Sequence, residues 1–272
     1  MDSLLRKNKG VTLIELLVAL VITGILVAAI YRTFIGQQKT YTVQEEVVDM
    51  QQNVRAAINQ MMTEIRVAGF GNVSMVLPVT IAGKTFNDVV NPNTPVAGSV
   101  TILSGGGATT VAAPPASNKV TVNSLTDSHG NTLFDTGDRK YVSIGGVESY
   151  VITDISGNTL TLSGTLTYSH PVGTAVYGIR AISYQVDGAG TLLRDENTGA
   201  GGQALADNIE NLLFGYLNAN GNPPAQNADI RVILVTLRAR TDAPDPEYKT
   251  DGGYRNRQIV SSIHLKNMGL EP

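Results

Sequence analysis

Glu15 is the residue whose type and position most need a chemical explanation, because it is the only charge in a long apolar stretch. The stretch covers residues 11–30, VTLIELLVALVITGILVAAI, and is twenty residues long. An acidic residue at the centre of a membrane-spanning helix costs about 2.5–3.5 kcal/mol. Glu15 lies near the boundary of the stretch, where the free-energy cost of burying a charge is smaller. A plain membrane anchor would still gain nothing from this charge. A cation close to Glu15 would give the charge a purpose.

Cleavage of the chain between Gly10 and Val11 would create such a cation. The new α-amino group of Val11 would then lie four residues before Glu15, which is one helical turn. The carboxylate could pair with that amine in the same chain or in a neighbouring copy. Pairing with a neighbour would require a second subunit to dock in register. The sequence therefore predicts that this charge is an assembly signal.

Two other interpretations of the segment stay open at this point. A secretory signal peptide has a shorter apolar core and then a small-residue cleavage site, with which Val27-Ala28-Ala29 is weakly compatible. A plain transmembrane anchor also fits, since twenty helical residues cross roughly 30 Å of hydrocarbon.

Residues 1–10 hold three basic residues and one acidic residue, a net charge of +2. This cationic flank predicts a cytoplasmic N-terminus.

The rest of the chain offers little catalytic chemistry. It has no cysteine, which excludes disulfides and thiolate chemistry. The three histidines, His129, His170 and His264, have no metal-ligand spacing. The run Gly105-Gly106-Gly107 lacks the Lys-Ser/Thr of a phosphate loop. A sequence pI near 5.6 gives no basic field for nucleic acid. We therefore expect neither an enzyme nor a nucleic-acid-binding protein.

An acidic loop is the remaining candidate for a ligand site. Residues 241–256 gather Asp242, Asp245, Glu247 and Asp251 with two prolines. Calcium favours several oxygens on a flexible loop, but the spacing is not that of an EF-hand. We expect no cofactor, with a solvated loop as the main interpretation and a Ca²⁺ site in residues 242–251 as the alternative.

A long helix is the element that must position Glu15. Apolar residues recur beyond the first stretch with spacings of three and four, typical of an amphipathic helix: Val43, Val47, Met50, Val54, Ile58, Met61, Ile65 and Ala68. No proline precedes Pro78, and Gly69-Phe70-Gly71 supplies a C-terminal stop. If continuous from residue 11 to residue 68, the helix is roughly 87 Å long. We expect its second half to pack on a β domain and its first half to protrude.

Residues 72–272 are predicted to be β-rich, with glycine turns between several strand pairs. The predicted strands are 76–81, 99–103, 119–125, 141–144, 148–155, 159–162, 176–186, 191–194, 212–217, 230–240 and 258–266. Residues 231–238 are apolar enough for a central strand covered on both faces. Residues 82–118 and 241–256 are predicted to be exposed loops. The expected fold is α+β, with a segment of residues 1–10 before the cleavage point, a helix over 11–71 and an antiparallel β-rich domain over 72–272.

The N-terminal residues carry a resemblance to a known family. Gly10-Val11-Thr12-Leu13-Ile14-Glu15, after a short basic leader and before an apolar helix, resembles the class III signal of type IV pilins and type II secretion pseudopilins. The commonest form of that signal has Phe where this chain has Val11. The resemblance implies that residues 1–10 are a leader removed by a prepilin peptidase and that Val11 is N-methylated. It also implies that residues 11–30 span the membrane and then form the filament core, with Glu15 setting the register and residues 31–71 amphipathic.

Looser similarities narrow the family. Residues 62–70, 182–194, 205–216 and 260–267 resemble segments of PilW-type minor pilins, and the J-type pseudopilins of type II secretion share much of the pattern. The resemblance implies a non-enzymatic subunit that is anchored in the bacterial inner membrane and then incorporated into a surface pilus, where it primes assembly or sits at the tip. Its partners would be other pilins, the prepilin peptidase and the pilus assembly platform. Sequence does not distinguish adhesion, twitching motility and DNA uptake, and the J-type pseudopilin is the alternative.

Overall fold

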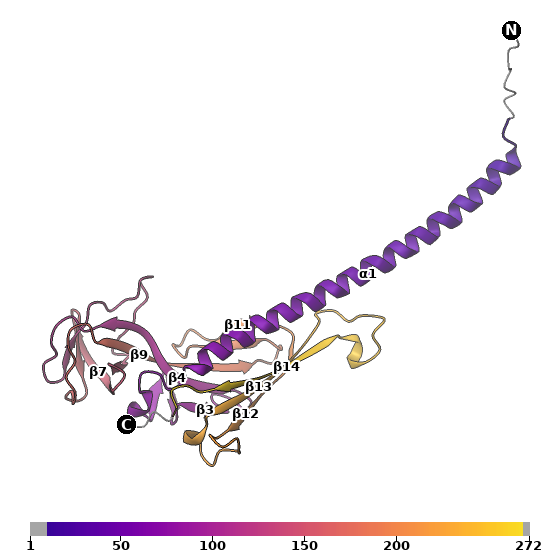
Figure 1. Cartoon of the computed structure of the whole chain (residues 1–272). Helices are drawn as coiled ribbons and strands as arrows, with labels where there is room; N and C mark the ends of the chain where they lie inside the picture. The colour runs from indigo at the N-terminus through magenta and orange to yellow at the C-terminus, as the bar shows by residue number, and fades with distance from the viewer. Residues whose placement is uncertain (1–9, 269–272) are drawn as a thin grey trace, which may run out of the picture. The chain divides into compact units, whose positions relative to one another are not determined.

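The fold begins with one long helix, α1, in a computed structural model that describes residues 10–268 (Figure 1). Helix α1 covers Leu13–Arg66, 54 residues, and is continuous, as expected for a segment without an interior proline. It starts two residues after the predicted residue 11 and ends five before residue 71. Of the predicted leader, residues 1–9 lie outside the described residues.

The chain forms two compact units, residues 1–49 and residues 50–272. The boundary between the units falls inside α1, because the second half of the helix buries its apolar stripe. The buried positions, each at most 7% exposed, are Met50, Val54, Ala57, Ile58, Met61, Ile65 and Ala68. The apolar spacing predicted all of these except Ala57.

The C-terminal end of α1 is fixed by backbone contacts from distant segments. The carbonyl of Arg66 accepts a hydrogen bond from the Lys266 amide at 3.2 Å, and the Gly69 amide donates to Leu103 O at 2.9 Å. Gly69 has a φ of +81°, and a Cβ there would lie 3.0 Å from the carbonyl oxygen of Asn267. The predicted glycine stop is therefore required by both conformation and close approach.

Three antiparallel sheets follow the helix. One contains β1 (Val79–Ile81) and β2 (Lys84–Phe86), and another contains β12 (Ile209–Leu217), β13 (Val232–Arg240) and β14 (Asn256–His264) in that order. The nine-stranded sheet has the order β11-β10-β9-β6-β7-β8-β5, with β4 pairing β3 and β9. Its strands are β3 (Val90–Pro92), β4 (Val100–Thr110), β5 (Lys119–Thr121), β6 (Tyr141–Ile144), β7 (Glu148–Ser156), β8 (Thr159–Leu162), β9 (Ala175–Val186), β10 (Leu192–Asp195) and β11 (Gln203–Ala206). Short 3₁₀ helices cover Val73–Val76, Asn227–Asp229 and Asp251–Gly253.

Each predicted strand overlaps an observed one, and β6 and β8 have the predicted bounds. Strand β13 is central in its sheet, as predicted, but its two faces differ. Side chains on one face are buried, and most on the other are only half-buried. The prediction missed β2, β3 and β11, which are only three or four residues long.

The prediction of an exposed loop over residues 82–118 is wrong in part. The segment contains β2, β3 and the whole of β4, and Phe86, Val90 and Leu103 in it are buried. Strand β4 continues through its three glycines because β9 pairs with it on both sides of a register shift between Gly105 and Ala108. Such a bulge accommodates extra residues without ending the strand.

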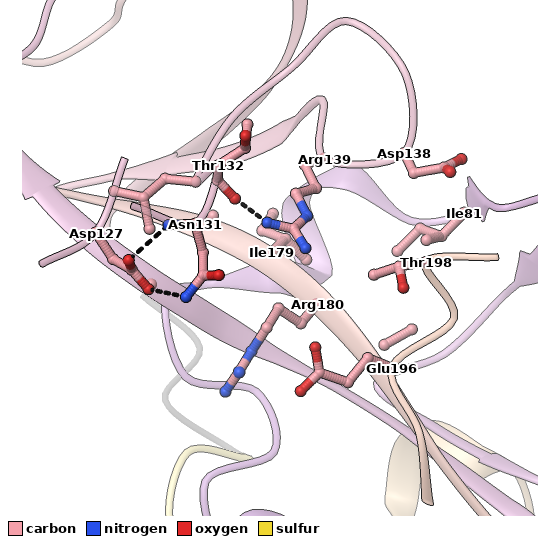
Figure 2. Close-up of a pocket in the computed structure, with 14 residues that line it drawn as sticks. Ile81, Asp127, Asn131, Thr132, Asp138, Arg139, Ile179, Arg180, Glu196 and Thr198 are labelled. Atoms are coloured by element: carbon pink, nitrogen blue, oxygen red, sulfur yellow. Dashed lines mark hydrogen bonds between the residues drawn. The ribbon is translucent and has the colours of Figure 1, made fainter. Parts of the chain in front are cut away.

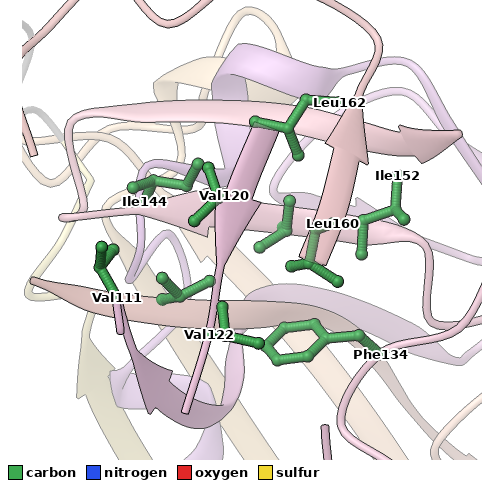
Figure 3. Packing of buried hydrophobic residues seen from close by; sticks show 10 residues of the cluster. Val111, Val120, Val122, Phe134, Ile144, Ile152, Leu160 and Leu162 are labelled. Atoms are coloured by element: carbon green, nitrogen blue, oxygen red, sulfur yellow. The ribbon is translucent and has the colours of Figure 1, made fainter. Parts of the chain in front are cut away.

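A hydrophobic cluster occupies the part of the domain formed by β5 to β9 (Figure 3). Phe134 from a loop packs among side chains such as Leu160 and Leu162 of β8 and Ile152 of β7. These four side chains are at most 2% exposed. The loop before β6 is thereby held against the sheet, which positions residues 127–139.

A buried ionic cluster, which we call the Glu64 clasp, joins α1 to the β9–β10 hairpin. Arg194 Nε donates to both Glu64 carboxylate oxygens at 3.0 and 2.9 Å, and the Tyr184 hydroxyl donates to the same carboxylate. Tyr184 and Arg194 are 0% and 7% exposed. Burial, together with the contact to Glu64, raises the pKa of the Tyr184 hydroxyl. Tyr184 therefore stays a neutral donor to the carboxylate at any physiological pH.

Removing Glu64 should destabilise the β domain. The Glu64→Ala variant leaves Arg194 Nε and the Tyr184 hydroxyl without their acceptor, and we expect a loss of about 3 kcal/mol. Denaturant unfolding of the full-length protein in detergent measures this loss. The control Gln60→Ala, on an exposed position of the same helix, should change stability by less than about 0.5 kcal/mol. Equal effects of the two variants would contradict the clasp.

Candidate functional site

The predicted cleavage site lies directly before the helix. Gly10, Val11 and Thr12 are non-helical, and all three are exposed. A peptidase needs an accessible bond outside regular structure, and the Gly10–Val11 bond meets this condition. Cleavage there leaves Val11 and Thr12 ahead of the first helical residue, Leu13.

Glu15 and Thr12 form a reciprocal cap at the start of α1. The Thr12 amide and hydroxyl both donate to Glu15 Oε2 at 3.2 Å, and the Glu15 amide donates to Thr12 Oγ1 at 3.4 Å. This is a capping box, in which the two residues satisfy each other's free backbone N–H groups. The carboxylate also lies at the positive end of the helix dipole.

Sequence reasoning placed Glu15 near Val11 but missed Thr12 as its partner. The signal was present, because Thr-x-x-Glu before an apolar run is the sequence pattern of a capping box. Glu15 therefore already has hydrogen-bond donors within its own chain before assembly. An incoming amine would compete with or add to these contacts.

The helix surface around Glu15 is entirely apolar and unburied. No side chain in the apolar window is buried, and α1 is the one helix of the described residues long and apolar enough to cross a membrane. Leu13, Leu20 and Ile30 are 83%, 68% and 68% exposed. Apolar surface on this scale needs a lipid or protein environment.

The three histidines have separate surroundings, and His129 Nδ1 lies 3.3 Å from the hydroxyl of its neighbour Ser128. His129 and His264 are exposed, whereas His170 is 5% exposed and contacts the Glu148 carboxylate through Nε2. The Tyr150 hydroxyl donates to the same carboxylate at 2.6 Å, and the amides of Thr167 and Tyr168 donate at 2.9 and 3.3 Å. This Glu148 cluster is closed and self-satisfied, so it fastens the segment after β8 to β7.

The hydrogen bonds around Glu148 change its acidity. Burial by itself raises the pKa of the Glu148 carboxyl, but donation from Tyr150, His170 and the two amides outweighs burial and holds the pKa below its usual value. A carboxylate with a lowered folded-state pKa stabilises the fold above its unfolded pKa. That contribution is lost as the pH falls through the lowered value.

Three of the four carboxylates of the acidic loop contact other side chains of the same chain. Arg255 donates to Asp245 Oδ2 from two nitrogens at 2.9 and 2.7 Å. Asp251 pairs with Arg238 at 3.3 Å, and Asp242 accepts from Asn208 at 3.3 Å. Among residues 10–268 no group of three or more His, Asp or Glu side chains could hold a metal ion. The Ca²⁺ site remains a prediction from sequence.

Comparison with known proteins supports the N-terminal motif. A family model described as the prokaryotic N-terminal methylation motif matches residues 5–31. The match includes the predicted cleavage site, Val11 and Glu15. The motif and the α+β fold indicate a structural subunit like a type IV pilin or pseudopilin, with a prepilin-type signal and a helix suited to membrane anchoring before assembly. Such a motif implies processing by a prepilin peptidase and assembly with other pilins. Neither a curated protein nor a solved structure matches the chain.

Thr12→Ala should loosen the first turn of α1. Loss of a capping side chain costs about 1 kcal/mol, so the amide hydrogens of Glu15 and Leu16, which donate to Thr12 Oγ1 and Thr12 O, should exchange about fivefold faster. Hydrogen-exchange mass spectrometry in micelles measures this. In Thr40→Ala, which removes only a hydroxyl bonded to Gly36 O within the helix, exchange of the same two amides should be unchanged. Unchanged exchange in Thr12→Ala itself would exclude a stabilising cap.

Glu148→Gln should lower stability at neutral pH by about 1–3 kcal/mol, because the charged acceptor of the cluster is lost. It should also flatten the loss of stability below about pH 4.3, the ordinary Glu pKa, since the lowered folded-state pKa of Glu148 no longer contributes. Denaturant unfolding between pH 2 and 7 measures both effects. Asp154→Asn, an exposed carboxylate on the same strand, is the control. An acid dependence equal to that of the unmodified protein would contradict this role.

Proposed function

We propose that the chain is a minor subunit of a type IV pilus. It is cleaved between Gly10 and Val11, N-methylated at Val11, and incorporated into the filament through α1, where it primes assembly or sits at the tip. The methylation motif over residues 5–31, placed on a long exposed apolar helix, is the observation that carries this proposal. Before assembly the same helix anchors the protein in the inner membrane, with its N-terminus in the cytoplasm.

The Glu64 clasp supports the PilW-type assignment. Glu64 lies in the segment 62–70, and Tyr184 and Arg194 lie in the segment 182–194, two of the four stretches that resemble that family. Their side chains meet in one buried cluster. The two similar segments are far apart in the sequence, but their side chains together fasten α1 to the β9–β10 hairpin.

The segment 260–267 adds a contact at the same end of the helix. Lys266 donates its amide to Arg66 O at 3.2 Å, and Asn267 Nδ2 donates to Val67 O at 3.3 Å. The residues that follow β14 therefore reach the helix C-terminus. A J-type pseudopilin of a type II secretion system is the alternative, because both families share the N-terminal motif.

Glu15 has a different task before and after cleavage. Before cleavage its carboxylate caps α1 through Thr12. After cleavage, a Val11 amine from a neighbouring subunit supplies a cation in an apolar environment, where opposite charges attract more strongly than in water. Docking in register is then favoured over other offsets of the helix.

The variants Glu15→Gln and Glu15→Ala separate these two tasks. Glutamine serves in a capping box, so Glu15→Gln keeps the cap and removes only the charge. We expect both variants to be cleaved normally and both to be incorporated into filaments at least about tenfold less, the loss from one missing charge-assisted contact. Mass spectrometry of sheared surface filaments measures incorporation from the peptide that begins at methylated Val11. Normal incorporation of Glu15→Gln would contradict a role for the charge.

The same measurement distinguishes the two families. Small amounts of the processed peptide in filaments, beside an abundant major subunit, are expected for a minor pilin. Processed protein that stays in the cell envelope would favour the secretion pseudopilin. A chain that retains residues 1–10 in every fraction would contradict the proposed processing.

A further inference from the structure

A polar pocket lies where strand β9 changes neighbours. On one side of β9, β6 pairs with residues 176–178 and β10 pairs with residues 183–186. Residues 179–182 therefore have no strand beside them on that side. Gly178, Ile179, Arg180 and Ala181 line a cavity of about 350 Å³ at this gap, which the loop 127–139 borders (Figure 2). This volume is within the range of roughly 300–1,000 Å³ typical of small-molecule sites.

The glycine run of β4 makes room for this pocket. A Cβ on Gly106 would lie 2.5 Å from Arg180 Cγ, and a Cβ on Gly107 would lie 2.3 Å from Leu133 Cδ2. Neither glycine has the positive φ that would itself demand glycine. Because Gly106 and Gly107 have no side chains, Arg180 and the loop residue Leu133 have room to lie against β4. The motif Gly105-Gly106-Gly107, which fits no phosphate loop, is explained by this packing.

Arg180 lines the pocket with a side-chain donor that lacks a hydrogen-bond acceptor in the described part of the chain. Its Nε is buried and makes no hydrogen bond within the described part of the chain, and none of the ion pairs there includes Arg180. A buried donor without an acceptor is costly and calls for a partner. Figure 2 shows Arg139, from the loop, beside the same opening, with one guanidinium nitrogen donating to Thr132 O. Two guanidinium groups thus border one cavity.

The acidic side chains of the lining determine which anion fits. Glu196 is paired with Arg194 at 2.8 Å, and both Asp127 oxygens accept hydrogen bonds from within the loop, including two from Asn131. Asp138 is exposed, and no hydrogen bond or ion pair within residues 10–268 involves its carboxylate. Because Arg194 pairs with Glu196, the lining keeps two arginines against two carboxylates and has no net positive charge. It therefore disfavours phosphates and nucleic acids, which need a basic field, and the Arg180 guanidinium can pair with one singly charged group.

The remaining polar groups match hydroxyls. Thr132, Thr198 and Asn131 line the pocket, and with Asp138 they also line an adjoining shallow depression. Together they offer both donors and acceptors. We propose that this pocket binds a carboxylate-bearing sugar, such as a hexuronic acid residue, with the carboxylate on Arg180 and the sugar hydroxyls on the threonine, asparagine and Asp138 side chains. A guanidinium binds a carboxylate through two parallel hydrogen bonds, and no carboxylate within residues 10–268 forms an ion pair with Arg180.

Saturation-transfer NMR on the full-length protein in micelles tests the proposal with four probes: glucuronate, glucose, N-acetylalanine and inorganic phosphate. Glucuronate should bind at least about tenfold more tightly than glucose, which lacks the charge, and than N-acetylalanine, which lacks the hydroxyls. Arg180→Gln should weaken glucuronate binding at least about tenfold, and Arg180→Lys should restore little of it because lysine lacks the planar fork. Arg257→Gln, an exposed arginine on β14, is the matched control and should not alter binding.

Several outcomes would overturn the proposal. These are no transfer to glucuronate, equal binding of glucose or N-acetylalanine, tighter binding of phosphate, or unchanged binding in a correctly folded Arg180→Gln variant, with the fold checked by circular dichroism. The inference is independent of the assembly function. Loss of sugar binding leaves filament incorporation through Glu15 intact.

Discussion

The Glu64 clasp is the interaction on which the architecture of the β domain depends. A helix that presents only apolar side chains to a sheet can slide or rotate at small cost, because hydrophobic burial is non-directional. A carboxylate held by Arg194 Nε at 3.0 and 2.9 Å, with the Tyr184 hydroxyl as a further donor, is directional. It fixes which residues of α1 face the β9–β10 hairpin. The stripe from Met50 to Ile65 then becomes buried.

The N-terminal end of the same helix, in contrast, has no tertiary contact within residues 10–268 that holds it in place. Its side chains bury nothing within the chain, and the one charge there is held by the neighbouring Thr12. A local cap of this kind is weak, about 1 kcal/mol. A stronger partner that arrives later can therefore replace it. The two glutamates of α1 that matter most thus differ in permanence, since Glu64 is tied to the fold and Glu15 remains available for an intermolecular partner.

The polar clusters of the β domain differ in whether they are complete. Glu148 receives four donors, including His170, and has no unused capacity. Arg180 keeps a buried donor without an acceptor, beside a cavity and at an irregularity of the sheet. A closed cluster stabilises a fold, whereas an open one beside a cavity is where a ligand gains most. This difference, more than residue type, separates a structural cluster from a candidate site.

The sequence by itself determined the elements that depend on neighbouring residues. The extent of α1 follows from a 3.6-residue apolar period without proline, and the cleavage motif and Glu15 lie within six consecutive residues. Most strands could be predicted because alternation and glycine turns are local signals. Even the Thr12–Glu15 cap was present in the sequence as a four-residue pattern.

Only the tertiary structure decided the contacts between distant segments. Strand β4 continues through Gly105-Gly106-Gly107 because β9, about eighty residues later, supplies its hydrogen bonds. Glu64 contacts Arg194, 130 residues away in the sequence, and His170 contacts Glu148, 22 residues away. The pocket at Arg180 exists because β6 and β10 pair with different parts of one strand. Local composition carries no information about such partners, since the free energy of each contact is realised only when the chain brings both groups together.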